Sequence, residues 1–423
     1  MNSKTDPIMD TRTTSTIFNV RCLITGEEMT KIVDLGMHPY ADTFIGKTQL
    51  HLSEPVFPLE CYLNQKSGQI QLGYITNAYD RYNLYEYSYT SSNSDFAKKH
   101  WDEYHAHITN KFNINNSCVI EIGANDGYLS HLFLNERNKV ICVDSSKEMC
   151  AIAEGKGLIV YNNIFNHEVS KQIHSDHGFA KLVIANNVFN HSNSPVDFAK
   201  GVANLLSEEG IFVFELPYWG STFESYKFDQ IYHEHVSYFT IKSSYNLLKQ
   251  AGLELFDFDI VDYHGGSLRV FAKKESNGEF YDKIHSAIQK EEESGYFNPD
   301  TYMKWQEKLL SKRNAFLSQL YNLKLNNPNV PIIGVGAAAK ANTFLNFYCL
   351  NKSIIDYISD SSKFKQGKFT PLTRIPIVDD SIFSKYDKAF ALILSWNIST
   401  DLMKSLKKIN PNIQFITVYN ENN

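Results

Sequence analysis

The sequence lacks any pair of cysteines at C-x-x-C spacing, although 423 residues include six cysteines. Scattered single cysteines suit free thiols in a reducing compartment better than a disulfide framework. The longest apolar run, "AFALIL" at 389–394, has the length of a buried strand and is too short to span a bilayer. The polar start "MNSKTDPIMDTRTTST" has no apolar core of the signal-peptide kind. We therefore expect a cytoplasmic protein without membrane segments.

The sequence also lacks an excess of positive charge. Lysine and arginine number 41 against 47 acidic residues, which gives a formal net charge of −6. Because binding to phosphate backbones favours a basic surface, we expect no nucleic-acid partner. The hydrophobic content of 43% and the charged content of 21% are those of an ordinary globular protein. The length allows two or three domains.

Apolar runs divide the chain into three predicted domains, at 1–75, 76–280 and 281–423. The first is loop-rich, with strand-like pieces such as "TKIVDL" and "GQIQLGYI". In the second, the runs "CVIEIG", "KVICVD", "LIVYNN", "KLVIAN" and "GIFVFELP" are separated by helix-length intervals. This alternation predicts an α/β fold with a parallel sheet. The third contains another strand, glycine turn and helix in "VPIIGVGAAAKANTFLNF".

Two further helical segments are predicted outside these strands. Residues 95–112 read as one helix, and residues 281–323 read as one long helical linker between the α/β units. The acidic triplet Glu291–Glu293 in that linker is most simply interpreted as a solvated helix face.

A glycine loop follows the first strand of the second domain, in "VIEIGANDGYLSHLF". Gly123 and Gly127 allow the backbone to approach a ligand and to turn sharply into the next helix. Glu121 ends the strand before the loop, and Asp144 ends the second strand. An acid at that position can bind both hydroxyls of a ribose. Because the loop and the acid coincide, we favour a ligand site over a glycine turn that binds nothing.

A second glycine loop, "IIGVGAAAKANT", contains Gly334-x-Gly336 followed by Lys340 and Asn342. Backbone N–H groups and an ammonium converging there suit a diphosphate. A single G-x-G is weak evidence, but basic residues outnumber acidic ones between 340 and 374 in an otherwise acidic chain. The alternative is a solvated surface face.

The run "FDQIYHEHVSYFT" places Tyr232, His233, Glu234 and His235 in succession. An imidazole is the natural general base near neutral pH. In an extended segment Glu234 faces opposite to the two histidines, whereas a turn brings the side chains together. The sequence leaves this geometry open, and His233 is as readily structural as functional. His191, after the fourth strand, is a second candidate for the same pocket.

With these motifs in order, the chain resembles the sugar C-methyltransferases that act on nucleotide-linked keto-deoxysugars. The resemblance runs from about residue 20 to the end, through "VDLGMHPYADTF", "YSYTSSNS", "VIEIGANDGYLS", "NNVFNH", "FDQIYHEHVSYFT", "YHGGSLRVF", "GVGAAAKANTFLNF", "KFKQGKF" and "LSWN". It implies a class I S-adenosylmethionine-dependent Rossmann-like domain, a C-terminal Rossmann-like α/β domain and a small N-terminal domain. It also implies S-adenosylmethionine at the first glycine loop and a nucleotide-diphosphate sugar held partly by the C-terminal unit.

The resemblance implies three sets of site residues. In the catalytic set His235 acts as base, and the others orient the sugar or stabilise an enolate: His235, Glu234, Tyr232, His191 and Tyr89. The cofactor set, with Asn163 near the adenine, is Glu121, Gly123, Asn125, Gly127, Tyr128, Asp144, Asn163, Asn187 and Tyr87. The substrate set is His264, Gly265, Arg269, Gly336, Lys340, Asn342, Lys365 and Trp396. For Tyr87 and Tyr89, interdomain packing is the alternative.

One feature departs from the family. Its N-terminal module usually carries two cysteine pairs that bind structural zinc, whereas "CLITGEE" keeps only Cys22 and "CYLNQKSGQ" keeps only Cys61. Two cysteines cannot close a four-ligand tetrahedral site, and neither His38 nor His51 stands at the expected spacing. We expect no bound metal and a module held by packing.

Two other functions remain open at this level: an O- or N-methyltransferase acting on another acceptor, and a catalytically silent binding protein of the same fold. The intact "YHEH" run and both glycine loops argue against the silent protein. An oxidoreductase is disfavoured because neither loop has the spacing of a dinucleotide fingerprint. The sequence leaves open the nucleotide, the keto sugar, the methylated carbon and the oligomeric state.

Overall fold

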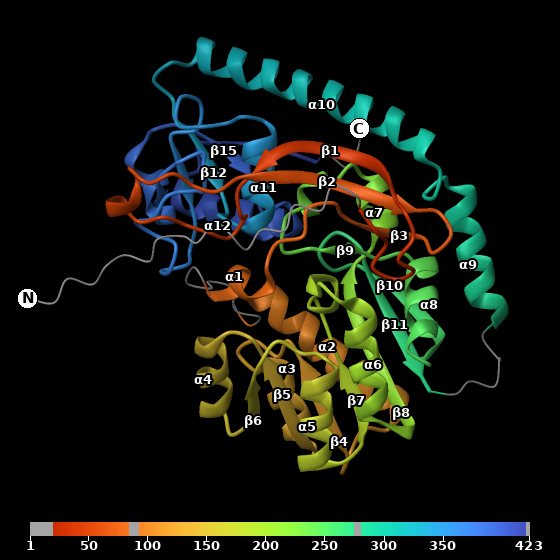
Figure 1. The fold of residues 1–423 in the computed structure, drawn as a ribbon. Coiled ribbons are helices and arrows are strands. Elements are labelled where there is room, and N and C mark those ends of the chain that lie inside the picture. The colour runs from red at the N-terminus through yellow and green to blue at the C-terminus, as the bar shows by residue number, and fades with distance from the viewer. Residues whose placement is uncertain (1–19, 84–91, 93, 275–280, 420–423) are drawn as a thin grey trace, which may run out of the picture.

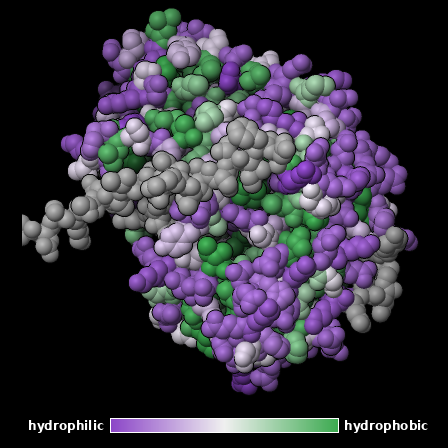
Figure 2. Space-filling view, viewed as in Figure 1, coloured by the Kyte–Doolittle hydropathy of each residue, from purple (hydrophilic) through white to green (hydrophobic). Residues whose placement is uncertain are grey.

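The computed structural model describes residues 20–83, 92, 94–274 and 281–419, and these residues form three β-sheets. In Figure 1 the largest sheet lies at the bottom, the C-terminal sheet at the upper left, and the strands of the first sheet cross between them near the top. Figure 2 shows polar residues over most of this face, with apolar residues gathered around a hollow near its middle. Within the described ranges, no helix has the length and apolar character that a membrane span requires.

A four-stranded antiparallel sheet has the order β1-β2-β3-β9. Its elements are β1 (Thr30–His38), β2 (Phe57–Asn64), β3 (Gln69–Leu72) and β9 (Ser237–Tyr238), with the short 3-10 helix η2 (Lys47–Gln49) between β1 and β2. Strand β9 comes from much later in the chain and pairs with β3 through Ile70 and Tyr238. The segment with the candidate catalytic histidines is therefore anchored to the N-terminal sheet.

A seven-stranded sheet has the order β10-β11-β8-β7-β4-β5-β6. Strands β4 to β8 are parallel, and β11 and β10 add antiparallel strands at one edge. The strands are β4 (Cys118–Ile122), β5 (Lys139–Asp144), β6 (Ile159–Asn162), β7 (Ala180–Ile184), β8 (Leu206–Pro217), β10 (Glu254–Val261) and β11 (Ser267–Lys273). The predicted α/β sheet is confirmed.

Both faces of this sheet are buried. In β4, Ile120 and Ile122 belong to one apolar core and Val119 to the core on the other face. A strand covered on both sides needs apolar residues at every position, which is why these strands read as continuous apolar runs. The helices of this part are α1 (Ala78–Asn83), α2 (Asp95–Phe112), α3 (Tyr128–Leu134), α4 (Lys147–Gly155), α5 (His167–His177), α6 (Pro195–Leu205), α7 (Trp219–Glu224) and α8 (Ile241–Gln250), with the 3-10 turns η3 (Phe189–His191) and η4 (Phe228–Gln230). The helix predicted at 95–112 is confirmed as α2.

A five-stranded parallel sheet has the order β14-β13-β12-β15-β16. Its elements are β12 (Ile332–Val335), α11 (Ala339–Phe347), β13 (Tyr357–Ser359), β14 (Ile377–Val378), η5 (Asp380–Lys385), β15 (Ala389–Ile393), η6 (Trp396–Ile398), α12 (Ser399–Ile409) and β16 (Ile413–Thr417). Each predicted range, 1–75, 76–280 and 281–423, thus supplies one sheet, with β9 as an exception. We keep these boundaries as a proposed division into domains.

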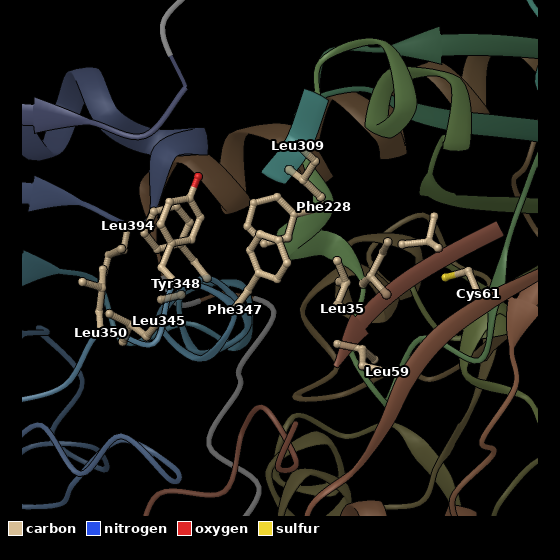
Figure 3. Close-up of a cluster of buried hydrophobic side chains, with 14 of the residues drawn as sticks. Leu35, Leu59, Cys61, Phe228, Leu309, Leu345, Phe347, Tyr348, Leu350 and Leu394 are labelled. Atoms are coloured by element: carbon tan, nitrogen blue, oxygen red, sulfur yellow. The ribbon is translucent and has the colours of Figure 1, made fainter. Parts of the chain in front are cut away.

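One apolar core joins the first and third sheets. Leu35 and Leu59 belong to β1 and β2, and Phe347 lies at the end of α11; all three are in the same buried cluster. Figure 3 shows Phe228 of η4 between these two groups. Its ring lies 4.6 Å from the Phe347 ring. The turn that precedes the "YHEH" run is therefore held from both sides by apolar packing.

The linker predicted as one helix at 281–323 is instead two helices, α9 (Tyr281–Glu293) and α10 (Pro299–Asn326). The Asn298 side chain caps α10 by accepting a hydrogen bond from the Asp300 N–H, and Pro299 occupies the first helical position. Both residues are favourable where a helix begins and unfavourable inside one. The prediction missed this start signal within an otherwise helical pattern.

Glu291 overturns the interpretation of the acidic triplet as a solvated face. It is 2% exposed, and its carboxylate accepts hydrogen bonds from the N–H groups of Ile241 and Lys242 and from the Tyr218 hydroxyl, at 2.7, 3.0 and 2.9 Å. Ile241 and Lys242 open α8, whose N–H groups have no partner within the helix. Glu291 thus joins α9 to the start of α8.

We expect Glu291→Ala to lower the free energy of unfolding by about 2–4 kcal/mol, because it leaves two buried N–H groups without an acceptor and removes a charge at a helix N-terminus. Urea denaturation followed by circular dichroism measures the change. Glu293→Ala is the matched control, since Glu293 is exposed on the same helix. Equal stability of the two variants would contradict this role.

Candidate active site

The first glycine loop joins β4 to α3 through conformations that favour glycine. Gly123 has a φ of +73° and Gly127 a φ of +72°. A Cβ atom on Gly123 would lie 2.6 Å from the Val188 side chain, and one on Gly127 would lie 2.6 Å from Leu158. The chain therefore needs glycine at both positions, for backbone conformation and for space.

Asp144 ends β5 and is bound to that loop. One carboxylate oxygen accepts the Asn125 N–H and the other accepts the Ser146 N–H, both at 2.8 Å. Burial raises the pKa of Asp144 above its usual value, and the two backbone hydrogen bonds oppose this effect. The carboxylate is therefore fixed in place at the mouth of the glycine loop, with lone pairs left to accept from a ligand.

A cavity of about 350 Å³ opens at the carboxyl end of β4, β5 and β7. Among its lining residues are seven of the predicted site residues: Glu121, Gly123, Asn125, Asp144, Asn163, Asn187 and His191. Glu121 lies at its base, where its carboxyl group accepts the Ser130 hydroxyl at 2.5 Å and burial raises its pKa to about 8. The structure thus brings together predicted cofactor residues at the ends of four strands, β4, β5, β6 and β7.

Two predicted cofactor residues do not line the cavity. Gly127 packs behind the loop against Leu158, so its role is to shape the turn. The Tyr128 hydroxyl donates to the Asp102 carboxylate of α2 at 3.0 Å, on the outside of the domain. The ligand contact predicted for both therefore stays a prediction. Tyr87 and Tyr89 lie outside the described residues.

The "YHEH" run forms a turn, closed by a hydrogen bond of 2.9 Å from the His235 N–H to the Tyr232 carbonyl. The turn places the His235 ring 3.9 Å from the Tyr232 ring and 5.1 Å from the ring of His191, which lines the cavity. The two segments with candidate histidines therefore meet beside the cavity.

The protonation state of His235 follows from its surroundings. Burial and the nearby Lys340 ammonium lower the pKa of His235 to about 3, so the ring is neutral at physiological pH. Its Nδ1 lies 2.9 Å from the Gln230 carbonyl oxygen, which can only accept, so Nδ1 carries the proton. Nε2 consequently keeps its lone pair, as a general base requires.

The other two members of the run face away from His235. His233 is fully buried, with Nε2 3.2 Å from the Pro58 carbonyl oxygen and its ring against Phe57. These contacts favour the structural interpretation of His233. Glu234 lies near Asp42 of the N-terminal segment, and burial together with that like charge raises its pKa to about 7. One Glu234 oxygen, Oε2, has no hydrogen-bond partner in the described structure.

The second glycine loop and Trp396 meet at the carboxyl end of β12 and β15. Gly336 has a φ of +94°, and a Cβ atom there would collide with the Ser395 side chain at 1.9 Å. The Lys340 ammonium lies 4.9 Å from the centre of the Trp396 indole and has no hydrogen-bond partner among the described residues. Trp396 itself donates from Nε1 to the Asp229 carboxylate at 2.7 Å.

The loop at 263–266 approaches this cluster from the seven-stranded sheet. Gly265 packs so closely against Trp396 that a Cβ atom would lie 2.4 Å from the indole. The Lys227 ammonium donates to the Gly265 carbonyl at 2.9 Å and lies 5.0 Å from the same indole. His264 is next in the chain, with a buried Nδ1 that no described residue contacts through a hydrogen bond. The junction between the two α/β units therefore gathers unpaired polar groups.

Three predicted substrate residues are engaged elsewhere. The Asn342 amide nitrogen donates to the Ala41 carbonyl at 2.5 Å, and Lys365 donates to the Ala337 carbonyl at 2.8 Å. Arg269 contributes Nε and Nη2 to one Glu215 oxygen, each at 2.7 Å, inside the seven-stranded sheet. These contacts hold loops and strands in place, and the substrate contacts predicted for the three residues stay predictions. The Asn342 side-chain oxygen is buried without a hydrogen-bond partner among the described residues.

Comparison with known proteins matches two domain families in succession. Residues 96–257 match a methyltransferase domain, and residues 262–418 match a C-methyltransferase C-terminal domain. The chain is 26% identical to the C-methyltransferase NovU of Streptomyces niveus over 394 residues, which are 92% of this chain and 93% of that one. The chain is an S-adenosylmethionine-dependent C-methyltransferase. Its central domain is the predicted class I methyltransferase fold, followed by a C-terminal domain with a parallel sheet.

Two solved methyltransferase structures align to parts of the chain. The magnesium protoporphyrin IX methyltransferase ChlM of Synechocystis with bound S-adenosylmethionine is 14% identical, covers 42% of this chain and 79% of its own, and has a TM-score of 0.33. An S-adenosylmethionine-dependent methyltransferase of Clostridium acetobutylicum is 15% identical, covers 44% and 94%, and has the same TM-score of 0.33.

S-adenosylmethionine fits the donor set of the methyltransferase cavity. Asp144 offers acceptors for the ribose hydroxyls. At the same cavity, both amide atoms of Asn186 and the Nε1 of Trp101 are buried without hydrogen-bond partners in the described structure. Such orphaned groups are costly unless a ligand satisfies them, and the amino-acid end of the cofactor offers a carboxylate and an ammonium. When bound, the cofactor supplies an electrophilic methyl group.

We expect Asp144→Ala to weaken S-adenosylhomocysteine binding by roughly 1.5–3 kcal/mol, because hydrogen bonds to a carboxylate are lost. Isothermal calorimetry on the purified variant measures this change. Glu148→Ala is the control, since Glu148 is an exposed acid on the helix that follows β5. Unchanged affinity in the Asp144 variant would place the ribose elsewhere.

The two single cysteines of the N-terminal module have separate, non-metal environments. The Cys22 thiol lies 3.4 Å from the Ser67 hydroxyl, which donates to the Asn64 side-chain oxygen at 2.9 Å. Cys61 lies in the apolar core, where burial raises the pKa of its thiol and so disfavours the thiolate that zinc requires. Among the described residues, no group of His, Cys, Asp and Glu is arranged to hold a metal ion.

We therefore expect elemental analysis of the purified methyltransferase to find far less than one zinc per chain, and its melting temperature to be insensitive to chelators. In this expectation packing and hydrogen bonds hold the module, so chelation removes nothing from it. About one tightly held zinc per chain would contradict this expectation.

Sequence reasoning missed several residues of this site. Trp101 and Asn186 line the cavity with unpaired polar atoms, and Gln230 has both side-chain amide atoms buried without partners among the described residues. Lys227 and Asp229 contact Gly265 and Trp396. The signal for the last three was proximity in sequence to the "YHEH" run, within "KFDQIYHEH". Trp101 gave no such signal, because one aromatic residue in an amphipathic helix reads as core.

Proposed function

We propose that this methyltransferase transfers a methyl group to carbon in a nucleotide-linked keto-deoxysugar and so makes a branched-chain sugar. Two observations support the substrate class: the ordered motifs shared with sugar C-methyltransferases, and a polar junction next to the methyltransferase cavity. The single observation that carries the chemistry is His235, a buried neutral histidine with Nδ1 bound to a carbonyl and Nε2 left as a base.

In the proposed substrate the carbon that receives the methyl group lies beside a ketone, and a base must first remove a proton from that carbon. A C–H bond beside a carbonyl is acidic enough for an enzyme base, because its electron pair delocalises into an enolate. In our proposal His235 Nε2 takes that proton. The enolate carbon would then bond to the methyl group as the carbon–sulfur bond of the cofactor breaks, which restores the ketone and releases S-adenosylhomocysteine. In our proposal Tyr232 and His191, whose rings lie beside the His235 ring, stabilise or orient the enolate.

The substrate's own charge strengthens this base. The Lys340 ammonium is one cause of the low pKa of His235. An anionic diphosphate bound at Lys340 offsets that positive charge, so the pKa of His235 rises when the substrate is in place. The proposed diphosphate site consists of Lys340, Lys227 and the Gly336 loop, with His264, Gly265 and Trp396 beside the sugar.

The direct test combines the purified protein, a nucleoside-diphosphate keto-deoxysugar and S-adenosylmethionine with a ¹³C-labelled methyl group. The proposal expects a product whose labelled carbon resonates as a C-methyl group and couples to ring carbons. A resonance in the O-methyl or N-methyl range would establish the alternative methyltransferase. Ligand binding without any product, across a panel of keto sugars, would favour a binding protein.

A further inference from the structure

A short helix connects the N-terminal sheet to the methyltransferase domain. Helix α1 begins shortly after strand β3 ends, and Figure 1 shows it between the strands of the first sheet and the seven-stranded sheet. Ala78, the first residue of α1, lines the methyltransferase cavity. Arg81, in the same helix, is 7% exposed. A buried guanidinium needs acceptors for its N–H groups, so its partners indicate what this helix holds in place.

The Arg81 guanidinium binds both segments that carry the candidate histidines. Its Nη2 donates to the His191 carbonyl at 3.0 Å and to the Asn193 side-chain oxygen at 2.6 Å. Its Nη1 donates to the His233 carbonyl at 3.4 Å, inside the "YHEH" turn. His191 and Asn193 line the methyltransferase cavity. One side chain therefore bridges the wall of that cavity and the turn that carries His235.

The chain just before Arg81 contacts the same two segments. The Leu72 N–H donates to the Val236 carbonyl at 2.9 Å, directly after the "YHEH" run. The Thr76 carbonyl accepts an N–H of the Asn193 side chain at 2.9 Å. Because a guanidinium can only donate and a carbonyl can only accept, Arg81 and Thr76 together determine the orientation of the Asn193 amide. The connection between the N-terminal sheet and α1 is therefore bonded to the turn and to the cavity wall in succession.

The relative position of the two histidine segments matters for the proposed chemistry. The His191 and His235 rings lie 5.1 Å apart, with His191 at the methyltransferase cavity and His235 as the proposed base. Methyl transfer to carbon needs the base, the acceptor carbon and the methyl group to be aligned together, and a displacement of about 1 Å can cost about 100-fold in rate. Arginine suits this positioning because its planar fork presents several donors in a fixed geometry, whereas lysine carries a point charge on a flexible stem.

We propose that Arg81 is a positioning residue for methyl transfer, which holds the His191 segment against the turn that carries His235. The N-terminal module then acts on the reaction by setting the distance between the wall of the methyltransferase cavity and the base. Arg81 acts through the two histidine segments and is not itself a catalytic residue. This inference rests on the proposed function, because it assumes that His235 is the base.

The kinetic test compares Arg81→Ala with Arg21→Ala, whose arginine is exposed in the same N-terminal module. On a keto-deoxysugar, Arg81→Ala should lower kcat by about 10- to 100-fold while KM for S-adenosylmethionine changes little, and Arg21→Ala should match the wild type. Arg81→Lys keeps the charge and most of the volume, so it should fold as the wild type does and still lower kcat. Guanidinium added to Arg81→Ala should restore part of the activity, whereas methylammonium, which lacks the fork, should not.

Spectra of ¹⁵N-histidine protein with S-adenosylhomocysteine test the same role without a sugar. The His235 Nδ1 proton, which is directed at the Gln230 carbonyl, reports the position of the turn and is assigned by its loss in His235→Ala. Arg81→Ala and Arg81→Lys should shift this resonance, and Arg21→Ala should not. An unshifted resonance in both Arg81 variants, or a wild-type kcat in them, overturns the role of Arg81. A wild-type protein that methylates no keto sugar overturns the proposed function, and the spectra then decide the role of Arg81 on their own.

Discussion

His235→Ala should abolish methyl transfer while both ligands still bind. The imidazole is the neutral base in the structure, with Nδ1 bound to the Gln230 carbonyl and Nε2 free of that bond. Removing a general base typically costs about 10²–10⁴ in rate, and the buried position of His235 leaves little room for water to substitute. Single-turnover rates, with ligand affinities from calorimetry, measure the two effects separately.

Hydrogen exchange identifies the step that fails. With S-adenosylhomocysteine in the cofactor site and the keto sugar in heavy water, the wild-type enzyme should exchange the proton beside the ketone for deuterium. His235→Ala should not exchange it. This assay reports deprotonation alone, because no methyl group is available for transfer.

Two further histidine variants test the assignment of His235 as the base. His51→Ala is the control, since His51 is exposed and far along the chain from the turn. Exchange at the wild-type rate in His235→Ala would transfer the role of base to another residue, with His191 first, because its ring lies 5.1 Å from that of His235. Loss of exchange in His233→Ala with a folded protein would move the assignment to His233.

Local signals were sufficient to predict the strands, the first glycine loop and Asp144. Each depends on residues adjacent in sequence: an apolar run makes a buried strand, glycine permits the turn, and an acid ends the next strand. The structure adds Val188 and Leu158, which pack so closely on Gly123 and Gly127 that no Cβ atom fits. Those contacts come from other strands and turns, so the sequence could not supply them.

Residues whose role depends on distant partners were misread. Glu291 looked like one of three solvated acids, yet it caps α8 about fifty residues earlier in the chain. Arg269 was expected only in the substrate set, and nothing in the sequence indicates its pairing with Glu215 of the neighbouring strand. In both cases the sequence predicts the helix or strand, but it does not predict whether the charged side chain faces solvent or the protein interior. Charge alone does not distinguish a solvated side chain from a buried one with partners.

The "YHEH" geometry was undetermined for a similar reason. Whether its side chains converge depends on the turn at Tyr232–His235, and that turn is held by β9 on the N-terminal sheet and by Phe228 in the shared core. Strand β9 is more than 150 residues away from the strand it contacts, as the pairing of Ile70 with Tyr238 illustrates.

The second large effect is expected at Lys340. Lys340→Met should weaken binding of the nucleoside diphosphate by about a hundredfold, because a buried ammonium loses its charge-assisted hydrogen bonds to the diphosphate. Methionine keeps the length and apolar stem of lysine. Since the ammonium has no partner among the described residues, the same substitution should leave the melting temperature of the ligand-free protein unchanged or raise it. Lys352→Met, at an exposed position in the same domain, is the control.

The pH dependence of nucleotide binding gives Lys340 a distinct signature. Burial lowers the pKa of Lys340 to about 8, with Lys227 adding to this effect and Asp229 opposing it. A diphosphate binds the protonated form, so the affinity should be constant below pH 8. Above pH 8 the free protein loses that proton, and the affinity should fall by up to about tenfold per pH unit. In Lys340→Met this decline should vanish. A decline that persists in the variant would assign the titration to another group, and a variant that is both destabilised and weak in binding would make Lys340 a structural residue.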